Sequence, residues 1–231
     1  MNAIRIVVIV LVIILLWIIW GYFTSSAGVS LLQLSDANIG SIIRNAPSSS
    51  TLENWAYSVW ISIDTWEPSK ENPKIIEVSG EGTSSGTNAF ELLLDGTKNE
   101  LIVNIGTNNG TRKCEIYNIP LQKWTHIIVS LDGKAVSIYK DGKIESVCTL
   151  DADMTPVNHS GTITISGGSN GNGFKGFLAK LTKYPNSVSP QEAWGYYKEG
   201  HGASGLLGFL SEYGFKMAVT KGGQDWTKVE I

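Results

Sequence analysis

The sequence is poor in charged residues and has no cluster of basic side chains. Asp, Glu, Lys and Arg make up 17% of the 231 residues, and the formal net charge is −3. A surface that binds nucleic acid needs a stripe or patch of Lys and Arg to neutralise phosphates. No segment of this chain carries such a block, and we therefore expect no nucleic-acid partner.

The chain also lacks zinc-ligand spacing and internal repeats. Its three histidines, His126, His159 and His201, have no Cys-x-x-Cys motif beside them and do not follow a zinc pattern. No self-similarity recurs at a period of about 20 to 50 residues, which argues against a solenoid or a propeller.

Cysteine is scarce, with only Cys114 and Cys148 in the chain. In an oxidising compartment the two would pair across the sheet, whereas in the cytosol they would remain two small buried thiols. Both states are compatible with the sequence. The sequons at Asn109 and Asn158 are usable only if the domain is lumenal.

The first 23 residues differ in character from the rest of the chain. Residues 6–23 contain no charge and no proline. As a helix they would reach about 27 Å, close to the thickness of the hydrocarbon core of a bilayer. Trp17, Trp20 and Tyr22 gather at the distal end, where an aromatic belt would lie. We predict a transmembrane anchor over residues 1–23; the alternative is a signal peptide cleaved at the small residues 25–28.

The flanking charges favour one membrane orientation. Arg5 is the only basic side chain before the apolar segment, and Arg44 is the first one after it. The positive-inside rule therefore favours a cytosolic amino terminus and an exoplasmic domain. Residues 24–50 are rich in Ser, Ala, Gly and Asn, which predicts a membrane-proximal linker. Its scattered Leu and Ile residues would either form a short amphipathic helix near the membrane or pack on the domain, and the sequence leaves both open: Leu31, Leu32, Leu34, Ile39, Ile42 and Ile43.

The remainder, residues 51–231, has the pattern of an all-β domain. Eight Trp and 25 Gly are high counts for this length and indicate many tight turns. Alternation within residues 54–63 predicts a strand whose buried face carries Trp55, Tyr57, Val59, Ile61 and Ile63. Further strands are predicted at residues 74–78, 89–94, 101–105, 113–117, 125–131, 135–139, 144–150, 162–166 and 176–183.

One helix interrupts the strands. Ser189 as N-cap, Pro190 at the first helical position and Glu192 at the third position predict a capping box, and Gly200 predicts the helix end. After it we expect a second short helix and a closing hairpin, at residues 204–214, 215–220 and 226–231.

The segment from Trp124 to Gly142 gives the sequence a specific resemblance. A Trp-x-His motif opens a run of aliphatics and a Tyr-x-Asp-Gly motif follows, carried here by Trp124, His126, Tyr139, Asp141 and Gly142. Over residues 52–200 the chain resembles the concanavalin A-like lectin/glucanase superfamily, especially its laminin G-like and pentraxin-like branch. The resemblance implies an antiparallel jelly-roll sandwich, here with one amino-terminal transmembrane helix, and implies that His126 has a structural role in the sheet.

The superfamily's enzymes place carboxylates at alternating positions of one strand, so that they face each other across a cleft. The nearest approaches in this chain are Glu77 with Glu81 and Asp151 with Asp153, all expected at strand ends or in loops. We therefore expect no enzyme. Laminin G-like domains often bind calcium through loop oxygens. Asp151, Asp153 and the loop 168–173 are the candidates for such a site, although no ligand set matches, and we expect no cofactor.

The layout of a short anchor before a lone sandwich resembles structural proteins of large icosahedral DNA viruses that carry an internal membrane. This resemblance implies a minor capsid protein of the virion, which would lie between membrane and shell and contact major and minor capsid proteins. The rival interpretation is a membrane-bound, lectin-like domain that binds carbohydrate at a cell surface. Candidate aromatics for a ligand or partner are Trp60, Trp66 and Trp226.

Overall fold

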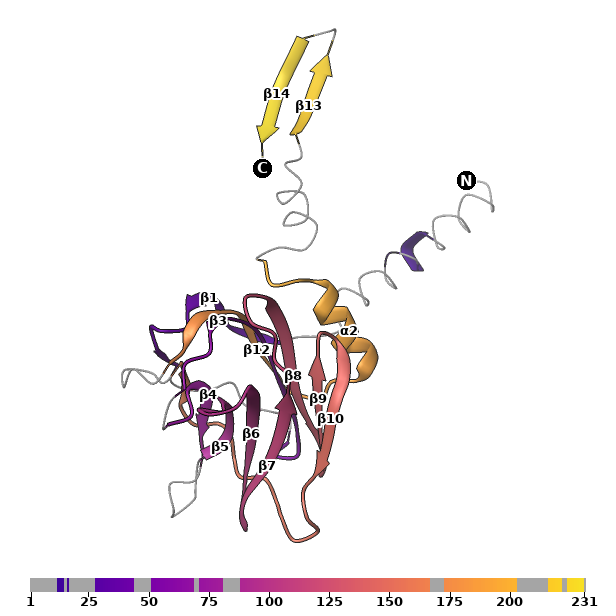
Figure 1. The fold of residues 1–231 in the computed structure, drawn as a ribbon. Helices are drawn as coiled ribbons and strands as arrows, with labels where there is room; N and C mark the ends of the chain where they lie inside the picture. The colour runs from indigo at the N-terminus through magenta and orange to yellow at the C-terminus, as the bar shows by residue number, and fades with distance from the viewer. Residues whose placement is uncertain are drawn as a thin grey trace.

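The chain forms an antiparallel β-sandwich of two six-stranded sheets (Figure 1). The computed structural model describes residues 12–14, 16, 28–43, 51–68, 71–80, 88–166 and 173–202, together with the strands at 216–221 and 224–230. All strand pairs in both sheets are antiparallel. The all-β sandwich fold predicted from the sequence is therefore confirmed.

The order of strands within each sheet is as follows. Sheet A contains β1 (Val29–Asp36), β12 (Lys175–Tyr184), β3 (Asn54–Thr65), β8 (Trp124–Asp132), β9 (Ala135–Lys140) and β10 (Lys143–Thr149). Sheet B contains β2 (Ser41–Ile43), β11 (Ile163–Ile165), β4 (Lys74–Ser79), β5 (Asn88–Leu94), β6 (Glu100–Thr107) and β7 (Gly110–Tyr117). A separate hairpin pairs β13 (Lys216–Lys221) with β14 (Gln224–Glu230), as expected from the sequence.

The core lies between the inner faces of the two sheets. The alternation predicted for β3 is confirmed, because Trp55, Tyr57, Val59, Ile61 and Ile63 all belong to the central cluster. Sheet B contributes its inward residues in the same way, such as those of β5 and β6. Tight side-chain packing between two pleated faces fixes the register of both sheets, since a one-residue slip would turn every apolar side chain outward.

The predicted linker, residues 24–50, is wrong over much of its length. Residues 29–43 contain β1 and β2, which form the edges of the two sheets. Leu31 and Leu32 pack against the core. A register shift between Ser30 and Leu32 interrupts the alternation of β1, and β2 has only three residues, so neither strand gave a clear signal within the Ser- and Asn-rich composition.

The predicted membrane anchor lies mostly outside the described residues. Only residues 12–14 and 16 of it are described; they are helical, and their apolar side chains are exposed. Among the residues with a described structure, no helix is long and apolar enough to span a bilayer. The predicted second helix at 204–214 also lies outside the described part of the chain.

The helix α2 (Pro190–Lys198) covers part of the outer face of sheet A and lies beside β10 (Figure 1). The predicted capping box is confirmed: the Glu192 amide donates to Ser189 Oγ, and the Ser189 amide donates to the Glu192 carboxylate at 2.8 Å. Just before the helix, Val188 is held from both sides. Its carbonyl accepts from the Tyr139 hydroxyl at 2.9 Å, and its amide donates to Ser130 Oγ at 2.8 Å.

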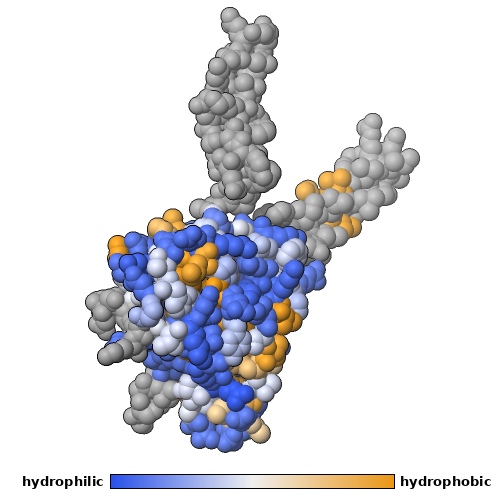
Figure 2. Space-filling model, viewed as in Figure 1, coloured by the Kyte–Doolittle hydropathy of each residue, from blue (hydrophilic) through white to orange (hydrophobic). Residues whose placement is uncertain are grey.

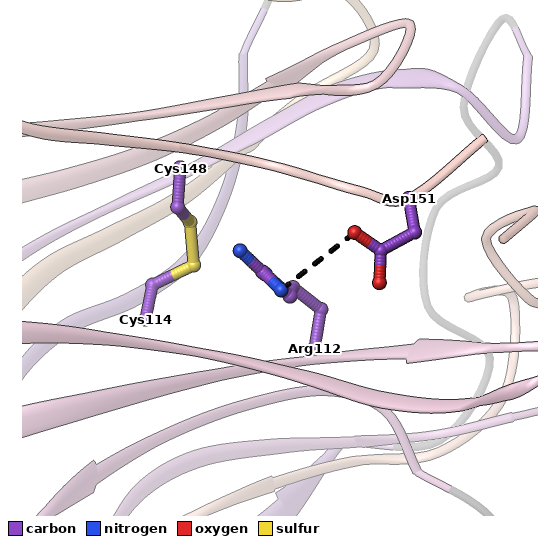
Figure 3. Close-up of a disulfide and its surroundings, with 4 residues drawn as sticks. All are labelled: Arg112, Cys114, Cys148 and Asp151. Carbon is purple, nitrogen blue, oxygen red and sulfur yellow. Dashed lines mark ion pairs between the residues drawn. A yellow bond between two sulfur atoms is a disulfide. The ribbon is translucent and has the colours of Figure 1, made fainter.

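A disulfide joins the two sheets at the edge opposite β1 and β2. Cys114 on β7, the edge of sheet B, bonds to Cys148 on β10, the edge of sheet A, with 6.3 Å between the Cα atoms (Figure 3). The bond therefore runs across the sandwich and not across one sheet. Near it, Arg112 approaches Asp151 at 3.9 Å. The bond closes the sandwich on the side where neither edge strand has a second neighbour.

Replacing both cysteines by serine should destabilise the domain without changing its fold. The bond closes a loop of sequence separation 34, and loop-closure entropy then corresponds to about 4 kcal/mol. Chemical denaturation of the oxidised chain and of C114S/C148S measures the difference in the free energy of unfolding. Reduced wild-type chain is the control and should match the double variant. Equal midpoints for the oxidised and reduced chains would contradict the stabilising role.

Candidate ligand-binding site

The Trp-x-His and Tyr-x-Asp-Gly motifs are brought together by the β8–β9 hairpin. Asp141 and Gly142 have φ values of 51° and 75°, as a two-residue turn of type I′ requires. The Asp141 carboxylate accepts from the His126 amide at 2.9 Å, and the Asp141 amide donates to the His126 carbonyl at 2.9 Å. These bonds close the β8–β9 hairpin, and the Tyr139 hydroxyl holds the segment before α2 through Val188. The motif residues therefore stabilise the fold.

His126 lies buried on the outer face of sheet A, beneath a set of aromatic rings. Its Nε2 lies 2.8 Å from Ser58 Oγ, and its ring stacks on Trp60 with centroids 4.7 Å apart. Tyr197 of α2 also stacks on Trp60, at 5.6 Å, and its ring lies 6.3 Å from that of His126. Burial lowers the pKa of His126 to about 3. The ring is therefore neutral at physiological pH. Among the described residues no carboxylate bonds to Nδ1 of His126, and both Ser58 and His126 are buried.

The three aromatic residues predicted to contact a ligand or partner lie in different parts of the domain. Trp60 lies on the outer face, as its place in the alternation indicated, but it is only 5% exposed and offers no open ring face. Trp66 follows β3 and lines a cavity. The side chain of Trp226, on β14, lies outside what the structure describes.

The cavity at Trp66 has a volume of about 290 Å³ and lies at one end of the sandwich. Four segments far apart in the sequence form it: the end of β3, the start of β4, the end of β5 and the start of β12. Trp66, Leu94 and Phe174 supply apolar wall, together with two prolines. The indole Nε1 of Trp66 donates to the Asp95 carbonyl at 3.2 Å, which fixes the ring in the wall.

The polar groups of the cavity are Glu67, Asp95 and Lys175. Lys175 Nζ pairs with the Glu67 carboxylate at 2.6 Å, and both side chains are more than half exposed. The Asp95 carboxylate accepts from the Thr97 amide at 2.7 Å and from the Thr97 hydroxyl at 2.8 Å. These hydrogen bonds, the backbone one foremost, lower the pKa of Asp95. The cavity therefore presents an apolar ring beside ionised groups of both signs.

The acidic candidates do not converge on a catalytic or metal site. Glu77 lies within β4 and not at a strand end as expected; it pairs with Lys74, while Glu81 lies outside the described residues. Asp153 accepts from the Asn109 side chain at 2.6 Å, and Asp151 faces Arg112. Within the described ranges, no three His, Cys, Asp or Glu side chains gather as metal ligands. Most of the loop 168–173, the other calcium candidate, is outside those ranges.

The polar residues of the cavity and several rings over sheet A were not identified from the sequence. Glu67, Asp95 and Lys175 are isolated charges whose proximity depends on the tertiary fold. The rings over sheet A had a local signal, because Trp194 and Tyr197 stand three apart on a helix and therefore share one face. Their centroids lie 5.4 Å apart, and His201 stacks on Trp124 at 4.5 Å.

Comparison with known families agrees with this geometry. The family model for the concanavalin A-like lectin/glucanases superfamily matches residues 37–193. The chain belongs to this superfamily. The match begins just after β1 and ends within α2. The resemblance inferred from the Trp124–Gly142 motifs is therefore confirmed. None of the curated proteins matches the chain.

Solved structures with the same superfamily fold include binding domains of botulinum neurotoxins. Botulinum neurotoxin type C, whose cell entry depends on interaction with two ganglioside molecules, gives a TM-score of 0.56 at 15% identity, covering 76% of this chain and 51% of that chain. The serotype D ligand-binding domain in complex with N-acetylneuraminic acid gives 0.54 at 15% identity, covering 72% and 41%. At such identities the likeness concerns the fold alone, and this chain spans only about half, or less, of those chains.

The buried histidines should make the domain sensitive to mild acid. The pKa values of His126 and His159 are lowered to about 3, mainly by burial, whereas an unfolded histidine has 6.5. Between these values the unfolded chain binds more protons, so stability is complete above pH 6.5 and falls as the pH decreases. At pH 5 the loss is about 2 kcal/mol per histidine.

Denaturant unfolding at pH 7 and pH 5 measures this effect in wild type, in H126Q and in the control H201Q, whose histidine is exposed. H126Q should roughly halve the pH dependence, and H201Q should leave it unchanged. Carboxylates with lowered pKa values contribute mostly below pH 5, outside this window. Equal pH dependence in wild type and H126Q would show that His126 is not held neutral in the folded chain.

Proposed function

We propose that the chain is a membrane-tethered, non-enzymatic module that binds carbohydrate on the exoplasmic side of its membrane. The observation that carries this proposal is the Trp66 cavity at the end of the sandwich. Its volume of about 290 Å³ is at the lower end of small-molecule sites, which are about 300 to 1,000 Å³. This size suits one or two sugar residues at the end of a larger glycan.

The chemistry of the cavity suits a sugar. A pyranose ring has an apolar face and a rim of hydroxyl groups that both donate and accept hydrogen bonds. The Trp66 indole supplies a flat apolar surface. The Glu67 and Asp95 carboxylates accept from hydroxyls, and Lys175 donates to them. Because Trp66 and Asp95 are held by their own hydrogen bonds, the site is organised before a ligand arrives.

A binding role is favoured over glycoside hydrolysis by the state of the carboxyl groups. Hydrolysis needs one carboxyl group with a raised pKa to act as a general acid beside an ionised partner. The pKa of Asp95 is lowered by its hydrogen bonds to Thr97, and Glu67 is paired with Lys175. Asp95 is therefore not prepared to donate a proton to a leaving sugar.

The Cys114–Cys148 disulfide supports an exoplasmic location. Disulfides form and persist in oxidising compartments and are rare in the cytosol. The predicted orientation of the apolar segment 6–23, with Arg5 on the cytosolic side, places the sandwich in such a compartment. Two proteins of the same fold interact with gangliosides, which are glycolipids with a carbohydrate head group, and with the sugar N-acetylneuraminic acid, which supports the ligand class.

A minor capsid protein that joins an internal viral membrane to its shell is the second candidate. Such a protein would have the same membrane anchor, but it would bind other proteins and not a glycan. Exposed Ile144 and Val147 on the edge strand β10 favour it, because apolar side chains on an open edge suit a protein partner. The disulfide ranks this candidate second, since a domain that faces a shell assembled in the cytosol would keep its thiols free.

Substitution of Trp66 should abolish most of the carbohydrate affinity. We expect wild type to bind members of a glycan array, and W66A to bind the best of them about tenfold more weakly, equivalent to about 1.4 kcal/mol. Isothermal titration with that glycan gives both dissociation constants. Trp66 also packs against the core, so E67Q, which keeps the side-chain size, tests the polar half of the site independently.

W194A is the matched control, because Trp194 is 42% exposed and lies outside the cavity. It should bind like wild type. Absence of wild-type binding to any glycan, or an equal loss in W194A, would reject the carbohydrate proposal. In that case cross-links from Lys143 to shell proteins in a native particle preparation would support the second candidate.

A further inference from the structure

The edge of the sandwich formed by β1 and β2 is apolar and exposed. We define the β1–β2 rim as Val29, Leu34, Ile39 and Ile42, whose side chains are 45%, 65%, 68% and 48% exposed. β1 is the last strand of sheet A and β2 the last strand of sheet B, on the side opposite the disulfide. Figure 2 shows apolar surface over the part of the molecule where Figure 1 places β1.

The rim wraps around this edge and does not belong to one face alone. Leu34 is opposite Ala179, whose other neighbour is Trp60, and it therefore points from the outer face of sheet A. Ile42 is opposite Thr164 and points from the outer face of sheet B, since the next pair, Ile43 with Ile163, faces the core. Ile39 lies in the connection between the two strands. Apolar side chains therefore project on three sides of one edge.

The same edge is nearly free of charge. Residues 28–43 contain one charged side chain, Asp36, and no lysine, arginine or proline. Natural proteins protect open edge strands with lysine, proline or a covering element, because an unprotected apolar edge pairs with other chains. An edge without these protections, and with four exposed large apolar side chains, is expected to be covered in the working protein.

The length of chain before Gly28 identifies what covers it. Four residues, 24–27, separate the apolar segment 6–23 from Gly28, so the two ends lie at most about 18 Å apart even in a fully extended chain. Gly28 is itself fixed on the domain, because a Cβ there would overlap the Tyr184 and Thr182 side chains. A membrane that holds residues 6–23 is therefore next to β1.

We propose that the β1–β2 rim docks onto the lipid surface of the membrane in which residues 6–23 are embedded. The inference rests on the anchoring part of the proposed function and does not depend on the ligand of the cavity. Because the tether makes docking intramolecular, insertion of a few apolar side chains at the interface suffices to hold the domain. Because Asp36 is the one charged side chain of this edge, contact with the head groups costs little desolvation of ionic groups.

Docking has a consequence for the Trp66 cavity. The Phe174 amide donates to the Ala37 carbonyl at 3.3 Å, and the Ala37 amide donates to the Gly176 carbonyl at 2.8 Å. The connection that carries Ile39 is thus bonded to the segment that lines the cavity. With the rim in contact with lipid, the domain would lie with its β1–β2 edge against the membrane. The cavity would then be beside the lipid head groups.

The test uses the full chain reconstituted in phosphatidylcholine vesicles, with an environment-sensitive fluorophore on one introduced cysteine. I39C places it on the rim, and I144C places it on the opposite edge, where the native side chain is 52% exposed. The native cysteines are bonded and do not react. We expect label 39 to brighten several-fold and to be quenched by spin-labelled lipid, and label 144 to behave as in water. L34S and I42S in the I39C chain should weaken the quenching.

Three other results would contradict the inference, and each identifies the step that is wrong. If the chain does not float with the vesicles, the anchor is wrong, and docking and the tethered function fail together. If it floats but label 39 remains in water, docking alone is wrong. If label 39 is shielded without lipid quenching and the chain cross-links to itself, the rim pairs with a second copy instead. Glycan binding is measured separately and stands or falls on the Trp66 variants.

Discussion

Strand β3 is buried on both faces, and the arrangement of the other elements follows from this constraint. Its inward side chains form the centre of the sandwich, while Ala56, Ser58 and Trp60 on the other face are also nearly inaccessible to solvent. A sheet with two buried faces needs a second cover. α2 and the segment after it supply that cover by placing Tyr197 over Trp60 and Ala193 near Ala56. The capping box and the bonds to Val188 matter because they fix this cover in position.

The two ends of the sandwich differ in how far their charged side chains are buried. At the end where β1 begins, Lys183 is buried near the Tyr57 ring and donates to the His159 carbonyl at 3.2 Å. Burial lowers its pKa to about 8. At the other end, Glu67 and Lys175 stay largely exposed around the Trp66 cavity. The first end therefore holds a buried charge, at a cost in stability, whereas the charges of the second end stay in contact with solvent, as the proposed binding role requires.

The sequence predicted the features whose causes are local. Alternation within β3, the Asp141-Gly142 turn and the Ser189 capping box each depend on residues a few positions apart, and each was placed correctly. β1 was missed because a register shift between Ser30 and Leu32 breaks its alternation, and β2 because it has only three residues. The cavity was missed, apart from Trp66, because Glu67, Asp95 and Lys175 come from different strand ends that meet only in three dimensions. Pairing of the two cysteines was predicted as one alternative. That the bond joins two different sheets could not be predicted, because it depends on which strands form the sheet edges.

The superfamily fold does not by itself decide the function, since one fold carries many unrelated sites. Three features combine on this domain: a disulfide at one edge, an apolar rim at the other, and a cavity at one end. The disulfide limits how far the edge strands β7 and β10 can separate, while the rim lies only a short tether from the apolar segment. Under the proposed docking, a rigid domain held at one edge would present its cavity in a restricted direction. Such a restriction favours recognition of ligands fixed on a surface, because both partners are oriented before they meet and lose less freedom on binding.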